Sequence, residues 1–346
     1  MPRPVRLHLF RTKHIDETIG EIERDGLALR RVLGPGSLVA LGVGAVIGTG
    51  IFATIGSASA GDASRPGAGP ALVVSFLLTA LVCAFTALCY AEFASMVPVA
   101  GSAYTYAYAT LGELVAWIIG WDLLLEYAIG NTAVAISWAS YMSALLDGLG
   151  VHVPWWLGVD YRTAARAPEL LAQAPHVLGV PIVFNALAAG VVALVTIVLV
   201  RGVRESASLN AWMVLVKVAI LAFFVVASAP FVHAANWHPF APNGFAGVGA
   251  GAAVIFFAYI GFDAVSTCAE ECKNPGRDMP IGIVGSLAAC TVVYVVVAAV
   301  FCGLVPYRDL VKMGEGERAQ ALAVAMRHAA MPGWTIGVVA LGSVIA

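Results

Sequence analysis

Long apolar runs separated by short polar segments dominate the sequence. Residues 70–89, 181–200 and 281–305 contain no Asp, Glu, Lys or Arg. About 20 apolar residues cross the hydrocarbon core of a bilayer, so each run is long enough for a membrane-spanning helix. Together with the turn signals, the pattern predicts helices over 36–58, 70–97, 113–146, 181–201, 206–232, 246–271 and 280–305, and the first part of an eighth from Gly333.

Composition narrows the fold class to an all-α polytopic membrane protein. Hydrophobic residues make up 60% of the chain and charged residues only 12%, whereas soluble domains carry about 25% charged residues. The six cysteines form no CxxC pair, and the seven histidines all lie outside the expected spans. We therefore expect no metal and no cofactor. The spans also lack HExxH and GxSxG motifs, so we do not expect an enzyme, and we expect no nucleic-acid partner.

Basic residues lie close to the membrane on one side of the predicted spans, at 30–31, 201–204 and 273–277. The positive-inside rule then predicts a cytoplasmic N-terminus. We expect residues 1–35 to form a cytoplasmic segment, with a charged surface helix over 11–31. The protein would be a multi-pass protein of the cell membrane (plasma or inner membrane).

The sequence GVGAVIGTGIF at 42–52 interrupts the first predicted helix with four glycines. Each glycine in a helix interior costs about 1 kcal/mol relative to alanine. Backbone N–H and carbonyl groups without a hydrogen-bond partner in the helix are tolerated at membrane depth only where they line a cavity or bind a ligand. Unwinding at Ile47, Gly48, Thr49 and Gly50 would expose N–H groups at the positive end of the following half-helix. Such an end is suited to a carboxylate.

A second interruption is predicted at Gly261, in the middle of the sixth helix. Discontinuous helices in corresponding halves of a chain point to the substrate site of a transporter. Carbonyl groups freed around Phe257, Ala258 and Ile260 would accept hydrogen bonds from an ammonium group. The two interruptions together predict a site for an α-amino acid. The alternative is that the glycines only allow close packing between helices.

Lys217, Asp263 and Glu126 are charged residues embedded in predicted spans, where a charge is costly and marks a functional candidate. Lys217 follows Arg204 by 13 residues, about 20 Å along a helix. A lysine at this depth can take up and release a proton, so we interpret Lys217 as the proton-coupling residue; a static partner for carbonyls or for an acid is the alternative. Asp263 could favour a cationic group at the substrate site or pair with Lys217 or a hydroxyl. For Glu126 we favour a structural role.

Three stretches resemble the amino acid–polyamine–organocation superfamily: GAVIGTGIF at 44–52, EFASMVPVAGSAYTYAYATLGELVAWIIGWDLLLEYAIGN at 92–131, and FFAYIGFDAVSTCAEECKNPGRDMPIGI at 256–283. The last stretch and the N-terminal RTKHIDETIGE resemble its cationic amino acid transporter branch. The resemblance implies a fold like that of the leucine transporter, built from two inverted repeats of five helices. Residues 36–232 would form the first repeat and 246–346 part of the second.

The resemblance also implies secondary active transport of amino acids by alternating access, frequently as symport with protons. It places the substrate carboxylate at residues 47–50, the ammonium at Phe257, Ala258 and Ile260, and Lys217 beside the first interruption. The expected partners are an amino acid, protons and the lipid bilayer. The substrate stays open between cationic and small neutral amino acids.

The eighth predicted helix is short, because Ala346 follows Gly333 by only 13 residues. By the resemblance, helices 9 onward and most of helix 8 are absent, so we expect a permease truncated at its C-terminus. The alternative to a working transporter is a non-transporting fragment, or a subunit that needs a partner.

Overall fold

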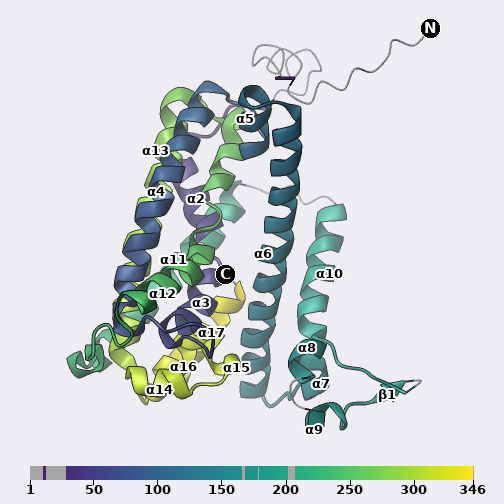
Figure 1. The fold of residues 1–346 in the computed structure, drawn as a ribbon, viewed down its shortest axis with the longest axis vertical. Helices are drawn as coiled ribbons and strands as arrows, with labels where there is room; N and C mark the ends of the chain where they lie inside the picture. Colours follow the sequence, from purple (N-terminus) through teal and green to yellow (C-terminus); the bar gives the residue numbers. More distant parts are fainter. Residues whose placement is uncertain (1–10, 13–28, 166–167, 178, 202–206, 346) are drawn as a thin grey trace. The chain divides into compact units, whose positions relative to one another are not determined.

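The computed structural model describes residues 11–12, 29–165, 168–177, 179–201 and 207–345, and helices make up most of them (Figure 1). Every predicted span has a helix close to its expected bounds. The charged helix expected over 11–31 lies almost entirely outside the described residues. The longer helices are α2 (Pro35–Val46), α3 (Thr49–Ala60), α4 (Leu72–Met96), α5 (Ser102–Thr110), α6 (Glu113–Gly148), α10 (Ala186–Arg201), α11 (Ala207–Ser228), α12 (Gly244–Tyr259), α13 (Pro275–Leu304) and α17 (Gly333–Ile345).

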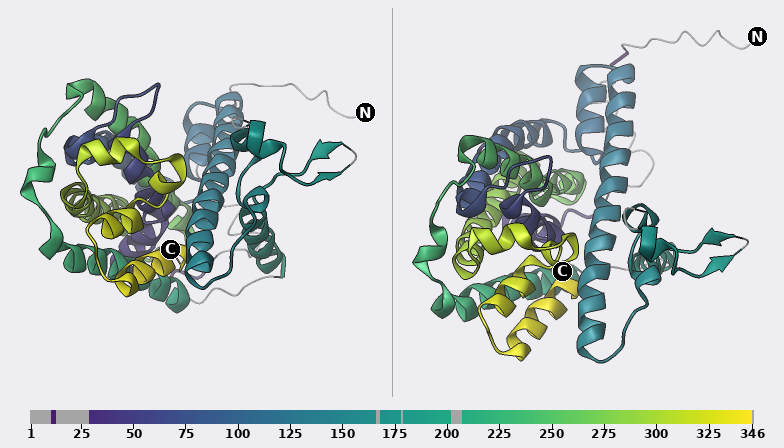
Figure 2. Two further views of the ribbon diagram at one scale, coloured as in Figure 1. Left: turned by 90° about the horizontal axis from the view of Figure 1, so that it is seen from below. Right: turned by 60° about the horizontal axis from the view of Figure 1, so that its bottom comes forward.

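Short elements connect these helices. Strands β1 and β2 pair antiparallel and project as a hairpin beside α7–α9 (Figure 2). The short elements are η1 (Gly69–Ala71), α7 (Trp155–Gly158), α8 (Tyr161–Ala164), α9 (Pro168–Leu171), β1 (His176–Val177), β2 (Val180–Pro181), η2 (Ala229–Phe231), η3 (Ala234–Trp237), η4 (Asp263–Glu271), α14 (Tyr307–Lys312), α15 (Glu315–Arg318) and α16 (Ala321–His328).

Among the described residues, four helical stretches are long and apolar enough to cross a membrane: Gly69–Met96, Trp212–Phe231, Gly244–Glu271 and Pro275–Leu304. The bent pair α2 and α3 adds a fifth when it is counted as one span. This number is smaller than the seven and a half helices predicted from the sequence. Helices α10 and α17 are shorter, and α6 contains several acidic and polar residues, so length and composition alone do not identify these three as spans.

Helix α13 begins earlier than predicted. The sequence analysis started the seventh helix at Pro280, whereas α13 begins at Pro275 and contains Pro280 in its interior. Proline is favoured in the first turn of a helix, where its missing N–H has no helical partner to lose. Pro280 follows closely enough that the helix loses hydrogen bonding only near its start.

The chain forms two compact units. The first unit consists of Met1–Val46, Leu78–Gly130 and Tyr259–Val292, and the second of Ile47–Leu77, Asn131–Ala258 and Val293–Ala346. The chain passes from one unit to the other at Val46–Ile47 and at Ala258–Tyr259, as well as within α4, α6 and α13. The proposed inverted repeats over 36–232 and 246–346 follow a different division of the chain and stay a prediction.

In the first unit, α2 packs against η4 and α13 without space for a side chain at Gly42. A Cβ added at Gly42 would lie 2.5 Å from Ser286 Cβ and 2.7 Å from Val265 Cγ2. Backbone hydrogen bonds also join the start of α2 to the end of η4, because Leu33 forms a parallel bridge with Cys272. The half-helices α2 and η4 are therefore held together along their length and at one end.

In the second unit, α3 forms much of the core. Its side chains Ile51, Phe52 and Ile55 are fully buried. Helices α14, α15 and α16 all contact α3, and α17 packs against α11, where Gly342 lies directly over Ile220. Figure 1 shows α3 among these C-terminal elements.

Candidate functional site

The first predicted interruption is present between α2 and α3. Helix α2 ends at Val46, Ile47 and Gly48 are not helical, and α3 begins at Thr49. Gly48 is the N-cap residue of α3 and has an extended backbone, with a φ of −119° and a ψ of −158°. Since glycine has no side chain, no side chain at this position binds the first N–H groups of α3. The first N–H groups of a helix have no partner within it. The interruption is narrower than predicted, because Thr49 and Gly50 already belong to the first turn of α3.

The second predicted interruption is also present. Helix α12 ends at Tyr259, and Ile260 and Gly261 form a turn in which Gly261 has a φ of +115°. Only glycine adopts such a conformation readily. The continuation η4 is a 3₁₀ helix of 9 residues, although such helices rarely exceed 3–4 residues. The sequence pattern did not distinguish this tighter helix from an α-helix.

Within each unit, the residues of the two interruptions lie in direct contact. In the second unit, a Cβ added at Gly50 would lie 2.7 Å from Ala258 Cα. The N-terminal end of α3 is therefore beside the C-terminal end of α12. In the first unit, a Cβ added at Gly261 would lie 2.7 Å from the carbonyl oxygen of Ala45. Since a helix carries partial positive charge at its N-terminus and partial negative charge at its C-terminus, α3 and α12 present opposite charges side by side.

Tyrosine hydroxyl groups bind carbonyl groups near both interruptions. Tyr294 Oη donates to the Ala258 carbonyl at 3.0 Å, and Tyr141 Oη donates to the Phe52 carbonyl at 3.0 Å. Both tyrosines are fully buried. The sequence analysis missed them, although a tyrosine inside an apolar helix needs a hydrogen-bond partner and is a signal that could have found them. The Ala258 carbonyl, predicted to receive an ammonium, thus already accepts one hydrogen bond and has a second lone pair.

Asp263 is buried in the first turn of η4. The positive end of η4 stabilises a carboxylate at this position. The Tyr127 hydroxyl also donates to Asp263 Oδ2, at a donor–acceptor distance of 3.5 Å that is long for a hydrogen bond. Glu126 directly precedes Tyr127 in α6. These contacts supply the structural role that the sequence analysis weighed for Asp263; its contact with a substrate stays a prediction.

Lys217 lies on the inward face of α11. Among the side chains of this helix that the structure describes, the buried ones are Val214, Ile220, Leu221, Phe224 and Ser228. Val214 and Ile220 lie three positions from Lys217, Leu221 lies four and Phe224 seven. This spacing places Lys217 on the same helical stripe. Lysines inside membrane-spanning segments face the protein interior rather than lipid, and Lys217 agrees with that pattern. Its contact with the first interruption stays a prediction.

A short loop follows α3 and is fixed by Asp62. The Asp62 carboxylate accepts hydrogen bonds from the hydroxyl and N–H of Ser64 and from the Arg65 guanidinium and N–H. These bonds, with the Ser64 hydroxyl foremost, hold the pKa of Asp62 well below its usual range because they favour the charged form. The loop therefore keeps its shape through the neutral and mildly acidic pH range.

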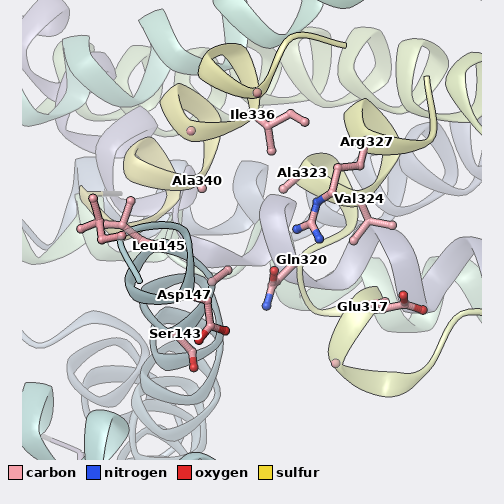
Figure 3. Close-up of a pocket in the computed structure, with 15 residues that line it drawn as sticks. Ser143, Leu145, Asp147, Glu317, Gln320, Ala323, Val324, Arg327, Ile336 and Ala340 are labelled. Atoms are coloured by element: carbon pink, nitrogen blue, oxygen red, sulfur yellow. The ribbon is translucent and has the colours of Figure 1, made fainter. Parts of the chain in front are cut away.

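A cavity of about 830 Å³ lies in the second unit between the end of α6, the α15–α16 segment and α17 (Figure 3). Its walls are mainly apolar, and its charged or polar members are Ser143, Asp147, Glu317, Gln320 and Arg327. None of the residues predicted to bind substrate lines it. In the described part of the chain, no group of three or more His, Cys, Asp and Glu side chains is placed to hold a metal ion.

The family model for amino acid permeases matches residues 33–346. The chain belongs to the amino acid permease family. The resemblance to the amino acid–polyamine–organocation superfamily and to its cationic amino acid transporter branch is thereby confirmed, as is a multi-pass helical membrane protein with a leucine-transporter-like fold.

Individual relatives differ in the substrate for which they are named. The chain is 47% identical over 250 residues to a methylthioribose transporter of Bacillus subtilis, covering 72% of this chain and 51% of the relative. It is 42% identical to the branched-chain amino acid permease BcaP of Bacillus subtilis, covering 80% of this chain and 56% of the relative. It is 43% identical to a chloroplastic cationic amino acid transporter of Arabidopsis thaliana, covering 69% of this chain and 40% of the relative. The chain thus spans about half, or less, of the length of these relatives.

The contact between the two interruptions predicts a difference between two glycine substitutions. Gly50→Ala places a methyl group against the Ala258 backbone, which cannot rotate away, so we expect the free energy of unfolding to fall by about 1–3 kcal/mol. Gly249→Ala in α12 meets no atom within 4 Å and should leave stability unchanged or raise it. Thermal unfolding midpoints in detergent measure both. Equal midpoints for the two variants would contradict the contact.

Proposed function

We propose that this protein transports L-amino acids across the cell membrane by alternating access, with the α-amino acid core bound at the two helix interruptions. The substrate carboxylate binds the N–H groups of residues 47–50 at the start of α3. The substrate ammonium binds carbonyl groups at Phe257, Ala258 and Ile260, at and just beyond the end of α12. Family membership and the relatives named as amino acid permeases and transporters support this function.

The observation that carries the proposal is the contact between Gly50 and Ala258. It brings a helix N-terminus and a helix C-terminus together at the two places where the backbone is open. An α-amino acid carries its carboxylate and its ammonium on one carbon, so adjacent positive and negative helix ends match both groups. A site that binds only one of these groups would not require both interruptions at the same place.

We further propose that uptake is symport with protons and that Lys217 takes up and releases the proton. Its place on the inward stripe of α11 supports this role, because burial there disfavours the charged amine relative to the neutral one. The same proposal places the N-terminus in the cytoplasm, as the basic residues at 30–31, 201–204 and 273–277 indicate.

Substrate analogues test the zwitterion site directly. In proteoliposomes, unlabelled L-amino acids should compete with a labelled amino acid, whereas their methyl esters and N-acetyl derivatives should not, because each lacks one of the two charges. Methylthioribose, for which one relative is named, is an uncharged competitor and should also fail. Competition by an ester or by methylthioribose at the concentration that suffices for the free amino acid would contradict the proposal.

Gly48→Ala tests the role of this residue in substrate binding without disturbing the fold. Its φ of −119° suits any residue, and an added Cβ meets no atom within 4 Å, so the fold should be kept. The methyl group would instead take up space in front of the α3 N–H groups. We expect the apparent affinity for the amino acid to fall by about 10-fold or more, at an unchanged unfolding midpoint. Unchanged affinity would remove Gly48 from the site.

Two substitutions at Lys217 test proton coupling. Lys217→Ala removes the proton-binding group, and Lys217→Arg keeps a charge that cannot be released. We expect both variants to lose accumulation driven by a pH gradient, while exchange of amino acid across the vesicle membrane continues. Unchanged proton-driven accumulation in Lys217→Ala would end the proposal. Retention of it in Lys217→Arg alone would show that the lysine is a static charge.

A further inference from the structure

The C-terminal end of α3 is held by an arginine from a distant part of the chain. Arg318 Nη1 donates to the carbonyl of Gly61, the C-cap residue of α3, at 2.6 Å. The last carbonyl groups of a helix have no partner within it and carry partial negative charge. A guanidinium is therefore well suited to bind there.

The same guanidinium also binds its own segment. Arg318 Nη2 donates to the Val311 carbonyl at 2.8 Å, whereas the buried Nε has no partner among the described residues. Two nitrogen atoms of one planar guanidinium, carried by the last residue of α15, thus connect the end of α3 to α14. A lysine has a single nitrogen and cannot reproduce this geometry.

Backbone packing makes the connection rigid. A Cβ added at Gly56 would lie 2.5 Å from the carbonyl oxygen of Arg318 and 2.8 Å from Ala321 Cβ. The segment formed by α15 and α16 also binds α6, because Gln320 Nε2, between these two helices, donates to the Ser140 carbonyl at 2.9 Å. Figure 3 shows Gln320 on this segment, facing the end of α6. The next residue of α6, Tyr141, binds the Phe52 carbonyl in α3.

The contacts of Arg318 with Gly61 and Gly56 hold the C-terminal half of α3, whose N-terminal end carries the proposed substrate site. Helix α3 has 12 residues and is about 18 Å long. Its N-terminal turn touches Ala258 through Gly50, and its C-terminal turn is held by Arg318. A change in the tilt of α3 at its C-terminal end therefore moves the N–H groups at its N-terminal end.

We propose that Arg318 is a positioning residue that sets the orientation of α3 and thereby the place of the N–H groups at residues 48–50. The role in substrate affinity rests on the proposed function. The control of α3 itself does not, and it can be measured without transport.

The first measurement is amide hydrogen exchange on Arg318→Gln and on the control Arg327→Gln. Arg327 belongs to the same segment and is exposed beside the cavity, and it makes none of the contacts to α3 described above. We expect Arg318→Gln to speed exchange at residues 57–61 and also at 53–55, whose N–H groups bind carbonyl groups of the first turn of α3, and Arg327→Gln to change neither. Faster exchange confined to 57–61 would overturn the proposal, because the far end of α3 would then be independent of Arg318.

The second measurement is amino acid uptake by the same variants. We expect Arg318→Gln to raise KM by about 3- to 30-fold with little change in Vmax per protein in the membrane. Arg318→Lys should lie between wild type and Arg318→Gln, and Arg327→Gln should match wild type. A loss of Vmax at constant KM would show a merely structural role. Absence of uptake by the wild type would contradict the proposed function and leave the exchange result to decide on Arg318.

Discussion

A backbone N–H or carbonyl group without a partner at membrane depth costs several kcal/mol, and this constraint explains the central features of the protein. The backbone opens between α2 and α3 and again between α12 and η4. The second opening depends on glycine, because Gly261 adopts a φ of +115°; at the first opening, Gly48 is an N-cap without a side chain, in an extended conformation that other residues also adopt. Polar side chains enter the apolar interior at the same places, as the hydroxyl groups of Tyr141 and Tyr294 show.

Close packing at glycine keeps the open segments together. Gly50 has no space for a Cβ beside Ala258, and Gly261 has none beside Ala45. The sequence analysis weighed tight packing as an alternative to a binding role for such glycines. The structure shows that the two explanations are compatible, because the contact at Gly50 is itself what brings opposite helix ends to one place.

The parts of the fold that depend on local sequence could be predicted. Runs without charge located the spans, and glycine at 48, 50 and 261 located both interruptions. Features that depend on distant contacts could not be predicted in this way. Neither the hydrogen bond of Tyr294 to Ala258 nor that of Arg318 to Gly61 leaves a periodic pattern in the sequence, and the tight 3₁₀ geometry of η4 has no separate hydropathy signal. The start of α13 was predicted five residues too late, at Pro280, because proline is tolerated both at the first position of a helix and in its early interior.

The charged residues divide into two kinds. Asp263 has compensation in the structure, from the start of η4 and from Tyr127, so its position is explained without a ligand. Lys217 lies on a stripe of α11 whose buried members are mainly apolar. The proposed proton coupling rests on this position, and the proposed recognition of the amino acid core rests on backbone groups.

The most direct test of the two-interruption site is an experimental structure of the protein in a membrane mimetic with a bound L-amino acid. The proposal predicts the carboxylate within hydrogen-bond distance of N–H groups at residues 47–50, and the ammonium within reach of the carbonyl groups of Phe257, Ala258 and Ile260. An amino acid bound elsewhere, with both interruptions unoccupied, would contradict it.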